Sequence, residues 1–588
     1  MKIIWKFESI KEKWITVGIM VSILLQVILE TAIPAQMANI STLLQTSGSK
    51  ISSIVEAGLK MSIYAVLAFL ISLLSSYLLA GICASVCCKI RKAIFEKIID
   101  FSMAETQYFG TGSLITRCTN DITTIESFIN SCMKPMVQAP LSAAIVILRI
   151  ATGEPLWTIM AILAMAIILS LVISIFIMVI PMVKKLSVYN DKLSTLTKEH
   201  VSGVRVIHAY NAFDKQKNEY EENNNAVAKL NVKQESMLAL FSPVTSFVLY
   251  GLSVVIYVSG AFVLKDMAVG TDRLLYYSNM VAFVSYITML IVAFVNLVSV
   301  IMMFPSTNNA SKRINEVLLS TISIKDASDA VEEHDDANEG TIEFRHVGFK
   351  YDNSEDYVLE DITFKVNKGE TLAIIGGTGC GKTSILNLIP RLCDVTKGEV
   401  LVDGKNVKDY KLSDLRNRIG YVPQKSFLFV GNIISNIAYG ENGRFKMVVD
   451  KVIEAAKIGQ ADDFIQMKEG GYTSKVMLGG SNFSGGQKQR LTISRAIYRD
   501  PEIYIFDDSF SALDFKTDKT LRDALKEYSK DKTTIIVGQR IGTIQDADRI
   551  LVIDKGKIVG QGTHTYLMNN CEVYKEIALS QLSSKEAM

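Results

Sequence analysis

The sequence predicts a membrane-embedded, all-α first half with six spanning helices, followed by an α/β second half. Three observations predict this: long charge-free segments in the first half, an acidic stretch after them, and alternating strand-like and helical runs beyond. Hydrophobic residues make up 49% of the 588 residues, and the net charge is only +2. Because no domain is strongly basic, the composition argues against nucleic acid as a partner.

Four charge-free segments are long enough to cross a lipid bilayer, which takes about 20 mostly apolar residues in a helix. They contain 28, 29, 29 and 38 residues, at 61–88, 155–183, Ser236–Leu264 and Leu274–Ser311. Two shorter apolar runs lie at Trp14–Leu29 and Pro135–Leu148. Together these segments predict six spans and a multi-pass protein of the cell membrane.

The orientation follows from the basic residues that flank the spans. Lysines at positions 2, 6, 11 and 13 precede the first apolar run, so a cleaved signal peptide is an alternative reading of that run. However, six spans return the chain to its starting side, and basic flanks belong in the cytoplasm. Basic clusters at 89–97 and 184–185 fit the same orientation. We therefore expect both termini and the whole second half to lie in the cytoplasm.

The acidic stretch "STISIKDASDAVEEHDDANEG" lacks hydrophobic periodicity, as expected of a solvated linker. It divides the chain into an expected transmembrane domain at 1–320, a linker at 321–339 and an α/β domain at 340–588. In the last of these, the strand-like runs "TIEFRHVGF", "TLAIIGG" and "IYIFDD" alternate with helical stretches. That alternation favours a largely parallel sheet.

The strongest chemical signal is the glycine-rich segment "IIGGTGCGKTS", which follows a strand-like run and opens a helix. Backbone N–H groups of such a loop close around phosphate oxygens, and the helix N-terminus adds positive potential. Lys382 is expected to reach the β- and γ-phosphates, and the Thr383 hydroxyl to bind Mg²⁺. A chance glycine loop is the alternative, but the strand–loop–helix context argues against it. The predicted ATP-binding residues here are Gly376, Gly377, Thr378, Gly379, Cys380, Gly381, Lys382, Thr383 and Ser384.

A second nucleotide signal is "YIFDDSFSALD", in which an apolar strand delivers Asp507 to its end. A carboxylate in that place is suited to hold Mg²⁺. We therefore predict ATP and Mg²⁺ as the ligands of the second half, with Asp507 and Thr383 on the metal.

Three further motifs occur in the expected order, and with them the chain resembles a half-transporter of the ATP-binding cassette (ABC) exporter family. They are "FKYDNSEDYVL", "YVPQKSFLF" and "NFSGGQKQR". The resemblance implies that Tyr351 stacks on adenine and that Gln424 contacts Mg²⁺ and senses the γ-phosphate. It also implies that a signature segment contacts ATP bound by the opposing subunit, through Ser484, Gly485, Gly486 and Gln487.

The first half resembles the same family, whose transmembrane domains of this kind have the type IV exporter fold. "GSLITRCTNDI" at 112–122 lies between the second and third spans, and "GVRVIHAYNAFDKQ" at 203–216 lies between the fourth and fifth. The resemblance implies that these are the two cytoplasmic coupling loops, which dock on the nucleotide-binding domains.

The chain departs from the family pattern at hydrolytic positions. Asp508 stands where relatives usually have a glutamate that activates water, and Gln539 stands where they usually have histidine. Leu478 replaces a glutamate that often helps to connect the domains. Because the ATP-binding residues are intact, the pattern resembles the degenerate-site subunit of heterodimeric multidrug exporters. A partner half-transporter would then supply the glutamate and the histidine.

The resemblance implies ATP-driven export of amphipathic small molecules, with hydrophobic drugs as the first expectation for the cargo. Two alternatives remain open: a homodimeric exporter of peptides or lipids with slow hydrolysis, and an ATP-gated regulatory membrane protein without transport. Glu30 interrupts the first span. Because a carboxylate within a bilayer is costly unless paired or hydrated, Glu30 is a candidate either for cargo binding or for a contact with a neighbouring helix.

Overall fold

The computed structural model of the chain describes two compact units. It describes residue 5 and residues 7–46, 49–151, 155–267, 271–326, 339–351, 354–441 and 446–586. The first unit comprises residues 1–98 and 112–320, and the second comprises residues 99–111 and 321–588. Most of the predicted linker, residues 327–338, lies outside the described residues.

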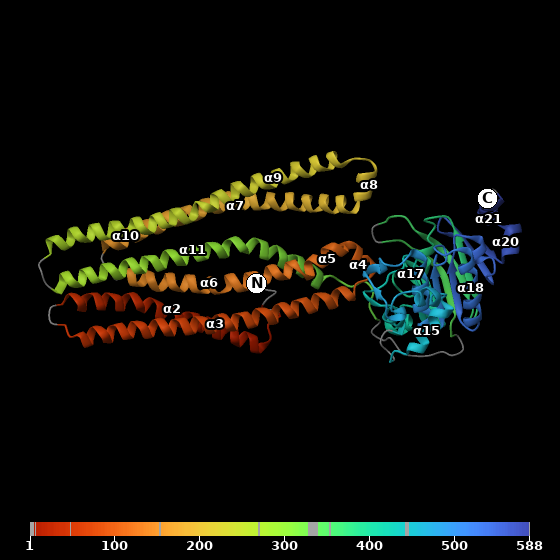
Figure 1. Ribbon diagram of the computed structural model, residues 1–588, viewed down its shortest axis with the longest axis horizontal. Coiled ribbons are helices and arrows are strands. Elements are labelled where there is room, and N and C mark those ends of the chain that lie inside the picture. The colour runs from red at the N-terminus through yellow and green to blue at the C-terminus, as the bar shows by residue number, and fades with distance from the viewer. Residues whose placement is uncertain are drawn as a thin grey trace. The chain divides into compact units, whose positions relative to one another are not determined.

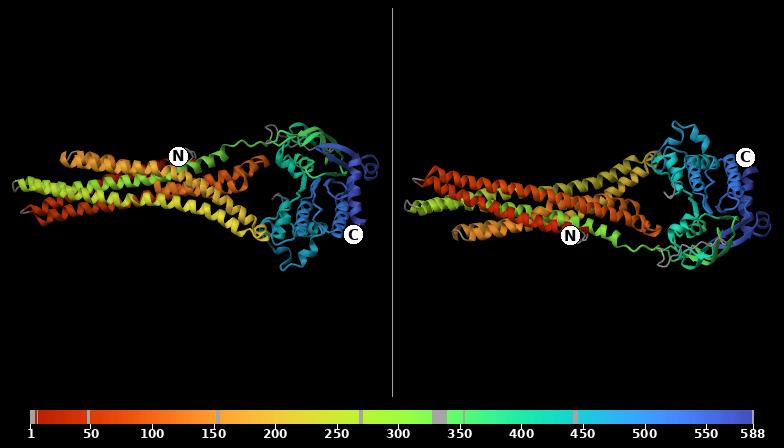
Figure 2. Two further views of the ribbon diagram at one scale, coloured as in Figure 1. Left: turned by 90° about the horizontal axis from the view of Figure 1, so that it is seen from above. Right: turned by 90° about the horizontal axis from the view of Figure 1, so that it is seen from below.

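The first unit contains long apolar helices that run side by side (Figures 1 and 2). Within the described residues, six helical segments are long and apolar enough to cross a membrane, which agrees with the six predicted spans. The helices that carry them are α2 (Ile10–Gln45), α3 (Ile51–Ile99), α6 (Asn120–Ala151), α7 (Pro155–Ser202), α10 (Phe241–Asp266) and α11 (Thr271–Leu319). Helix α2 continues through Glu30 and Pro34, as helices within membranes tolerate proline.

Polar contacts join helices of the first unit across its apolar interfaces. The Thr42 hydroxyl of α2 donates to the Ser278 hydroxyl of α11 at 2.7 Å. Asp121 of α6 is 2% exposed and accepts a hydrogen bond from Nε of Arg313 on α11 at 2.9 Å. Arg117, on the short helix α5 (Thr111–Cys118), pairs with Glu316 of α11 at 3.0 Å. These ion pairs hold α5 and the start of α6 against the last turns of α11.

The two stretches that the resemblance identifies as coupling loops contain short helices. Residues 112–122 form α5 and the first turn of α6. Residues 203–216 form α8 (Val204–Ala209) and the beginning of the polar helix α9 (Phe213–Ala239). Each stretch therefore joins two helices through a short helical corner, and its docking role remains a prediction.

The second unit contains three sheets, shown in the right part of Figure 1. A six-stranded sheet has the order β12-β11-β3-β10-β9-β6. Its strands are β3 (Thr371–Gly376), β6 (Ile419–Val422), β9 (Ile503–Asp507), β10 (Thr533–Val537), β11 (Arg549–Asp554) and β12 (Lys557–Gly562). Only the β11–β12 pair is antiparallel among these described strands. The predicted largely parallel sheet is therefore confirmed.

The other two sheets are antiparallel. A four-stranded sheet has the order β2-β1-β4-β5, formed by β1 (Ile342–Phe349), β2 (Leu359–Val366), β4 (Lys397–Val402) and β5 (Lys405–Asn406). A small sheet pairs β7 (Gly431–Asn432) with β8 (Lys475–Val476).

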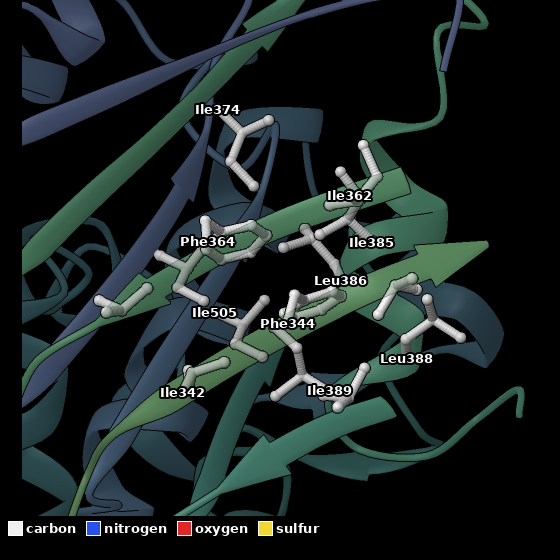
Figure 3. Packing of buried hydrophobic residues seen from close by; sticks show 14 of the residues in the cluster. Ile342, Phe344, Ile362, Phe364, Ile374, Ile385, Leu386, Leu388, Ile389 and Ile505 are labelled. Atoms are coloured by element: carbon white, nitrogen blue, oxygen red, sulfur yellow. The ribbon is translucent and has the colours of Figure 1, made fainter. Parts of the chain in front are cut away.

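The main core of the second unit fills the space between the two large sheets and helix α12 (Lys382–Leu388). Figure 3 shows Phe344 of β1 and Phe364 of β2 beside Ile505 of the parallel sheet and Ile385 of α12. The two phenylalanine rings stack with centroids 4.5 Å apart. Burying such side chains contributes about 25 cal/mol per Å² of apolar surface. This core fixes α12, and hence the glycine-rich loop before it, against the sheet.

Replacing Phe344 with alanine is expected to destabilise this core by about 3–5 kcal/mol, because it removes a fully buried ring and leaves a cavity. Hydrogen exchange of the full chain, measured by mass spectrometry on peptides from β1 and β2, gives the local opening free energy. The control is Met467→Ala, since Met467 is 85% exposed and should change that free energy by less than about 0.5 kcal/mol. Equal exchange in both variants would contradict the assigned core.

Candidate functional site

The parallel strands of the second unit place the predicted nucleotide residues at one edge of the sheet. β3 ends in the glycine-rich loop, β9 ends at Asp507, and β10 is followed by Gly538 and Gln539. Because these strands are neighbours in the sheet, their carboxyl ends lie together. Ligands of open α/β sheets bind at this edge.

The loop geometry requires glycine at two positions. A Cβ atom at Gly376 would lie 2.1 Å from the carbonyl oxygen of Ile553, which no side chain tolerates. Gly381 precedes α12 with φ at +101°, in the left-handed region that favours glycine. The loop therefore approaches the backbone of β11 closely and then turns sharply into the helix.

Lys382 lies over the loop that precedes it. Its Nζ donates to the carbonyl oxygens of Gly376 at 2.8 Å and Gly377 at 2.7 Å. The sulfur of Cys380 is 3.7 Å from the same nitrogen. An ammonium group held by two carbonyls at the mouth of a glycine-rich loop is available to an incoming phosphate, which offers a stronger, charged acceptor.

Thr383 and Asp507 form an adjacent pair of oxygen ligands. The Thr383 hydroxyl donates to the Asp507 carboxylate, with oxygen–oxygen distances of 3.0 and 3.3 Å. Burial raises the pKa of Asp507, and the hydrogen bond from Thr383 opposes that change. One hydroxyl and one carboxylate fit Mg²⁺, which takes few protein ligands and completes its shell with water and phosphate oxygens. The residues present therefore fit the predicted metal.

Asp508 is held by two amide side chains that come from distant parts of the sequence. Its Oδ2 accepts hydrogen bonds from Gln424 Nε2 at 3.2 Å and from Gln539 Nε2 at 2.8 Å. Its backbone N–H donates to the carbonyl of Val537 at 3.0 Å, and its φ is +48°. The side chain is nearly buried, with the residue 9% exposed. Gln424, Asp508 and Gln539, three of the predicted site residues, thus form one hydrogen-bonded network.

The remaining loop residues lie beside this network. The Tyr351 hydroxyl is 3.0 Å from the Ser384 hydroxyl, which connects the predicted adenine-stacking residue to the start of α12. Tyr351 is 40% exposed, so its ring has an accessible surface for stacking. Gly377, Thr378 and Gly379 continue the loop between β3 and α12.

The signature residues form a separate helix start. Ser484 caps α17 (Gly485–Arg499), accepting from the Gln487 backbone N–H at 3.3 Å, and the Gln487 side chain accepts from the Ser484 backbone N–H at 3.1 Å. In the described part of the chain, no hydrogen bond joins residues 484–487 to residues 376–384. A Cβ at Gly485 would meet nothing within 4 Å, so this helix start has an open face.

Leu478, the third departure from the family pattern, lies in a short 3₁₀ turn at Leu478–Gly480 and is 72% exposed. An apolar leucine side chain cannot form the ion pair or the charged hydrogen bond that a glutamate at this position could form.

One positioning residue was missed by the motifs. Gln581, on α21 (Glu572–Glu586), donates from Nε2 to the carbonyl of Gln539 at 2.7 Å and accepts from the Ile541 N–H at 2.8 Å. It fixes the backbone on both sides of the turn that carries Gln539. Because a glutamine near the end of a polar helix has no sequence signature, only the tertiary contact identifies it.

In the first unit, Glu30 is paired with neutral amides. Its Oε1 accepts from Gln26 Nε2 at 2.7 Å, and its Oε2 accepts from Gln138 Nε2 of α6 at 3.3 Å. Gln26 is 4% exposed, and its own Oε1 has no hydrogen-bond partner among the described residues. The sequence left two interpretations of Glu30, cargo binding and contact with a neighbouring helix. The structure shows the contact with α6, and the Oε1 atom of Gln26 beside it remains available as an acceptor.

Comparisons with known proteins match both units. The family model described as ABC transporter transmembrane region matches residues 16–294, and the ABC transporter model matches residues 359–511. A Bacillus subtilis protein named for multidrug export, an ATP-binding/permease protein, is 30% identical over 490 residues, 83% of this chain and 82% of the relative. The ATP-dependent lipid A-core flippase of Syntrophus aciditrophicus is 30% identical over 505 residues, 84% of this chain and 80% of the flippase.

The fold is shared with a solved structure of a bacterial Atm1-family ABC exporter with ATP bound, at a TM-score of 0.81. The match covers 96% of this chain and 99% of that chain at 23% identity, so it bears on the fold alone. Together with the six apolar helices and the parallel-sheet unit, these matches give one assignment. The chain belongs to the ABC transporter family, as a multi-pass membrane half-transporter of the exporter type whose cytoplasmic domain is an ATPase coupled to transport.

Proposed function

We propose that this chain is one half of a heterodimeric exporter, in which its own ATP site is degenerate and its signature residues serve the partner's hydrolytic site. The observation that carries the proposal is the network around Asp508. Its carboxylate receives both Gln424 and Gln539, so the group in the position of the general base is surrounded by amides that cannot take up a proton at neutral pH.

The position of Asp508 supports slow hydrolysis at this site. Aspartate is one methylene shorter than glutamate, and a displacement of about 1 Å from a reactive geometry can cost roughly 100-fold in rate. Gln539 can hydrogen-bond a phosphate oxygen, but unlike histidine it cannot become a cation or shuttle a proton. Both departures reduce turnover without removing a binding contact.

In the same proposal, this chain has all of the residues that bind ATP at its own site. Lys382 contacts the β- and γ-phosphates, the loop from Gly376 to Ser384 encloses them, and Tyr351 stacks on adenine. Thr383 and Asp507, together with Gln424, would hold Mg²⁺, which would supply positive charge to offset the phosphates. Ser484, Gly485, Gly486 and Gln487 contact ATP bound by a partner that contributes glutamate and histidine.

The direction of transport is export from the cytoplasm, with both termini and the domain at 340–588 on the cytoplasmic side of a transmembrane domain at 1–320. The proposed cargo is a group of amphipathic small molecules, in line with the relative named for multidrug export. The relative named as a lipid A-core flippase favours lipids as the second candidate cargo.

Replacing Lys382 with alanine is expected to weaken ATP binding at this chain's own site by at least about tenfold, because a charge-assisted contact to phosphate is worth roughly 1.5–3 kcal/mol. Binding of a fluorescent ATP analogue to the purified full chain measures the change. The control is Lys368→Ala, since Lys368 forms a surface ion pair with Glu339 at 2.7 Å. Equal affinity in the two variants would remove Lys382 from the phosphate site.

If the signature residues of this chain serve the partner's hydrolytic site, Gly485→Asp should abolish ATP turnover by the assembled transporter. The change places an anion beside the partner's γ-phosphate, where repulsion is strong in a desolvated interface. Because a Cβ at Gly485 has open space, the chain's own fold should be unaffected. Asp508→Ala should reduce steady-state turnover by less than about twofold, since this site contributes little hydrolysis.

Changing the partner's corresponding glutamate to glutamine should stop turnover in the same assay. If Asp508→Ala instead lowers turnover as much as the partner's change does, this chain's site is catalytic. The homodimeric alternative then becomes the better account.

The cargo hypothesis predicts that Glu30→Gln weakens transport of cationic compounds severalfold and spares neutral ones. Glutamine removes the negative charge and keeps one acceptor oxygen for the N–H group of Gln26 or Gln138. Its new N–H group can donate to Gln26 Oε1, which has no partner among the described residues. Transport of matched cationic and neutral dyes into vesicles measures the difference, with Gln36→Glu as a variant that adds a charge on the same helix. An equal effect on both dyes assigns Glu30 to helix packing.

A further inference from the structure

A cavity of about 320 Å³ lies on the second face of the six-stranded sheet, away from the glycine-rich loop. Side chains alternate between the two faces of a strand. On β9, Ile503 and Ile505 therefore face the core shared with the four-stranded sheet, whereas Tyr504 and Phe506 belong to a different cluster. The cavity lies over this second set.

Two groups of packed residues meet beside this space, which is lined by α18 on one side and by Thr543 and residues 546–548 on the other. One group packs around Tyr504 and Phe506 and includes α17 and α18 (Phe515–Tyr528). The other packs around Ala373 and Ile375 of β3 and includes α20 (His564–Asn570) and α21. Ile536 of β10 packs partly against both clusters. The cavity thus lies at the junction of two hydrophobic clusters.

The floor of the cavity is a row of hydroxyl-bearing residues. In the parallel register, Thr534 of β10 is paired with Thr371 of β3 on one side and with Tyr504 of β9 on the other. All three line the cavity. They occupy the starts of their strands, at the opposite end from Asp507, so this row is distinct from the nucleotide residues.

Two of these hydroxyls have no hydrogen-bond partner among the described residues: Tyr504 Oη and Thr534 Oγ1. Tyr504 is 0% exposed and Thr534 is 6% exposed. By contrast, the hydroxyl of the adjacent Thr533, on the other face, donates to the carbonyl of Gly340 at 2.5 Å. Buried hydroxyls are nearly always paired in native proteins, so two unpaired ones beside one cavity indicate a missing partner.

The walls and the mouth of the cavity define the chemistry of that partner. Phe506 and Phe510 contribute rings 5.4 Å apart, and Leu525 of α18 adds an aliphatic wall. The charged residues that line the cavity include three acidic ones and two basic ones. They are Asp523, Asp546 and Asp548, and Arg522 and Lys526. Aromatic walls favour an aromatic occupant, and the excess of carboxylates disfavours an anion.

We propose that this cavity binds a small neutral aromatic molecule that carries a carboxamide or a similar donor–acceptor group. The Tyr504 hydroxyl donates to the carbonyl oxygen of the ligand, and the Thr534 hydroxyl accepts from its N–H group. A phenol is protonated at neutral pH, and burial raises the pKa of Tyr504 further. The volume is at the lower end of the range of small-molecule sites, which suits a ligand of one or two rings.

The probe for this site is 4-fluorobenzamide, titrated into the full chain in lipid nanodiscs and followed by its ¹⁹F NMR line width. Empty nanodiscs supply the lipid background. We expect saturable binding to the wild type, weakened roughly 5- to 10-fold by Tyr504→Phe and by Thr534→Val, since each change removes one hydrogen bond. Fluorobenzene, which lacks the amide, should bind more weakly and should not distinguish these variants from the wild type.

Tyr472→Phe is the matched control. The Tyr472 hydroxyl donates to Asp462 at 2.6 Å and does not line the cavity, so its loss should leave probe affinity unchanged. Hydrogen exchange of β9 and β10 peptides checks that each variant is folded. Saturating ATP should not displace the probe, because the phosphate loop lies at the other end of the strands.

Three results would overturn the proposal. The first is wild-type binding that does not exceed the lipid background. The second is equal probe affinity in the wild type, Tyr504→Phe and Thr534→Val, which would mean that ordered water pairs the two hydroxyls. The third is displacement of the probe by ATP, which would place it at the nucleotide site.

Discussion

The parallel pairing of β3, β10 and β9 is the constraint on which the second unit depends. The register sets Val537 beside both Ile374 and Asp507, so the glycine-rich loop, Asp507, Asp508 and Gln539 emerge at one edge. Because strand positions are tied together by backbone hydrogen bonds, a shift of one residue would move every side chain to the other face. The same register aligns Thr371, Thr534 and Tyr504 at the opposite ends of the strands. One pairing pattern therefore generates both the nucleotide site and the cavity.

Much of this architecture was predictable because it depends on local sequence. Four long charge-free segments and two shorter apolar runs predicted the six spans, and the strand–loop–helix pattern around Lys382 predicted the loop. The network at Asp508 was not predictable, because no periodicity indicates that Gln424 and Gln539 share one carboxylate oxygen. The same limit applies to Gln581 and to the Glu30–Gln138 contact between α2 and α6. These contacts join segments far apart in the chain, and tertiary packing decides them.

Asp508 and Gln539, the two hydrolytic positions at which the chain departs from the family pattern, are joined by a hydrogen bond. An isolated buried carboxylate is costly unless hydrogen bonds satisfy it. Here the side-chain amides of Gln424 and Gln539 donate to the Asp508 carboxylate. The Asp508 backbone has a positive φ and donates its N–H to the carbonyl of Val537. A histidine at position 539 could exchange a proton with the site, whereas glutamine can only orient and hold. Asp508 and Gln539 therefore belong to one hydrogen-bonded network, so a change at either residue alters the contacts of the other.

The nucleotide site and the cavity are parts of one continuous segment of chain. Strand β9 carries Tyr504 and Phe506 to the cavity and ends at Asp507. Phe510, on the cavity wall, follows Asp508 by two residues, and the Ser511 hydroxyl donates to the Asp508 carbonyl at 3.0 Å. Strand β9 and the turn after it therefore contribute residues to both places, although the row of hydroxyl-bearing residues and Asp507 lie at opposite ends of the strands.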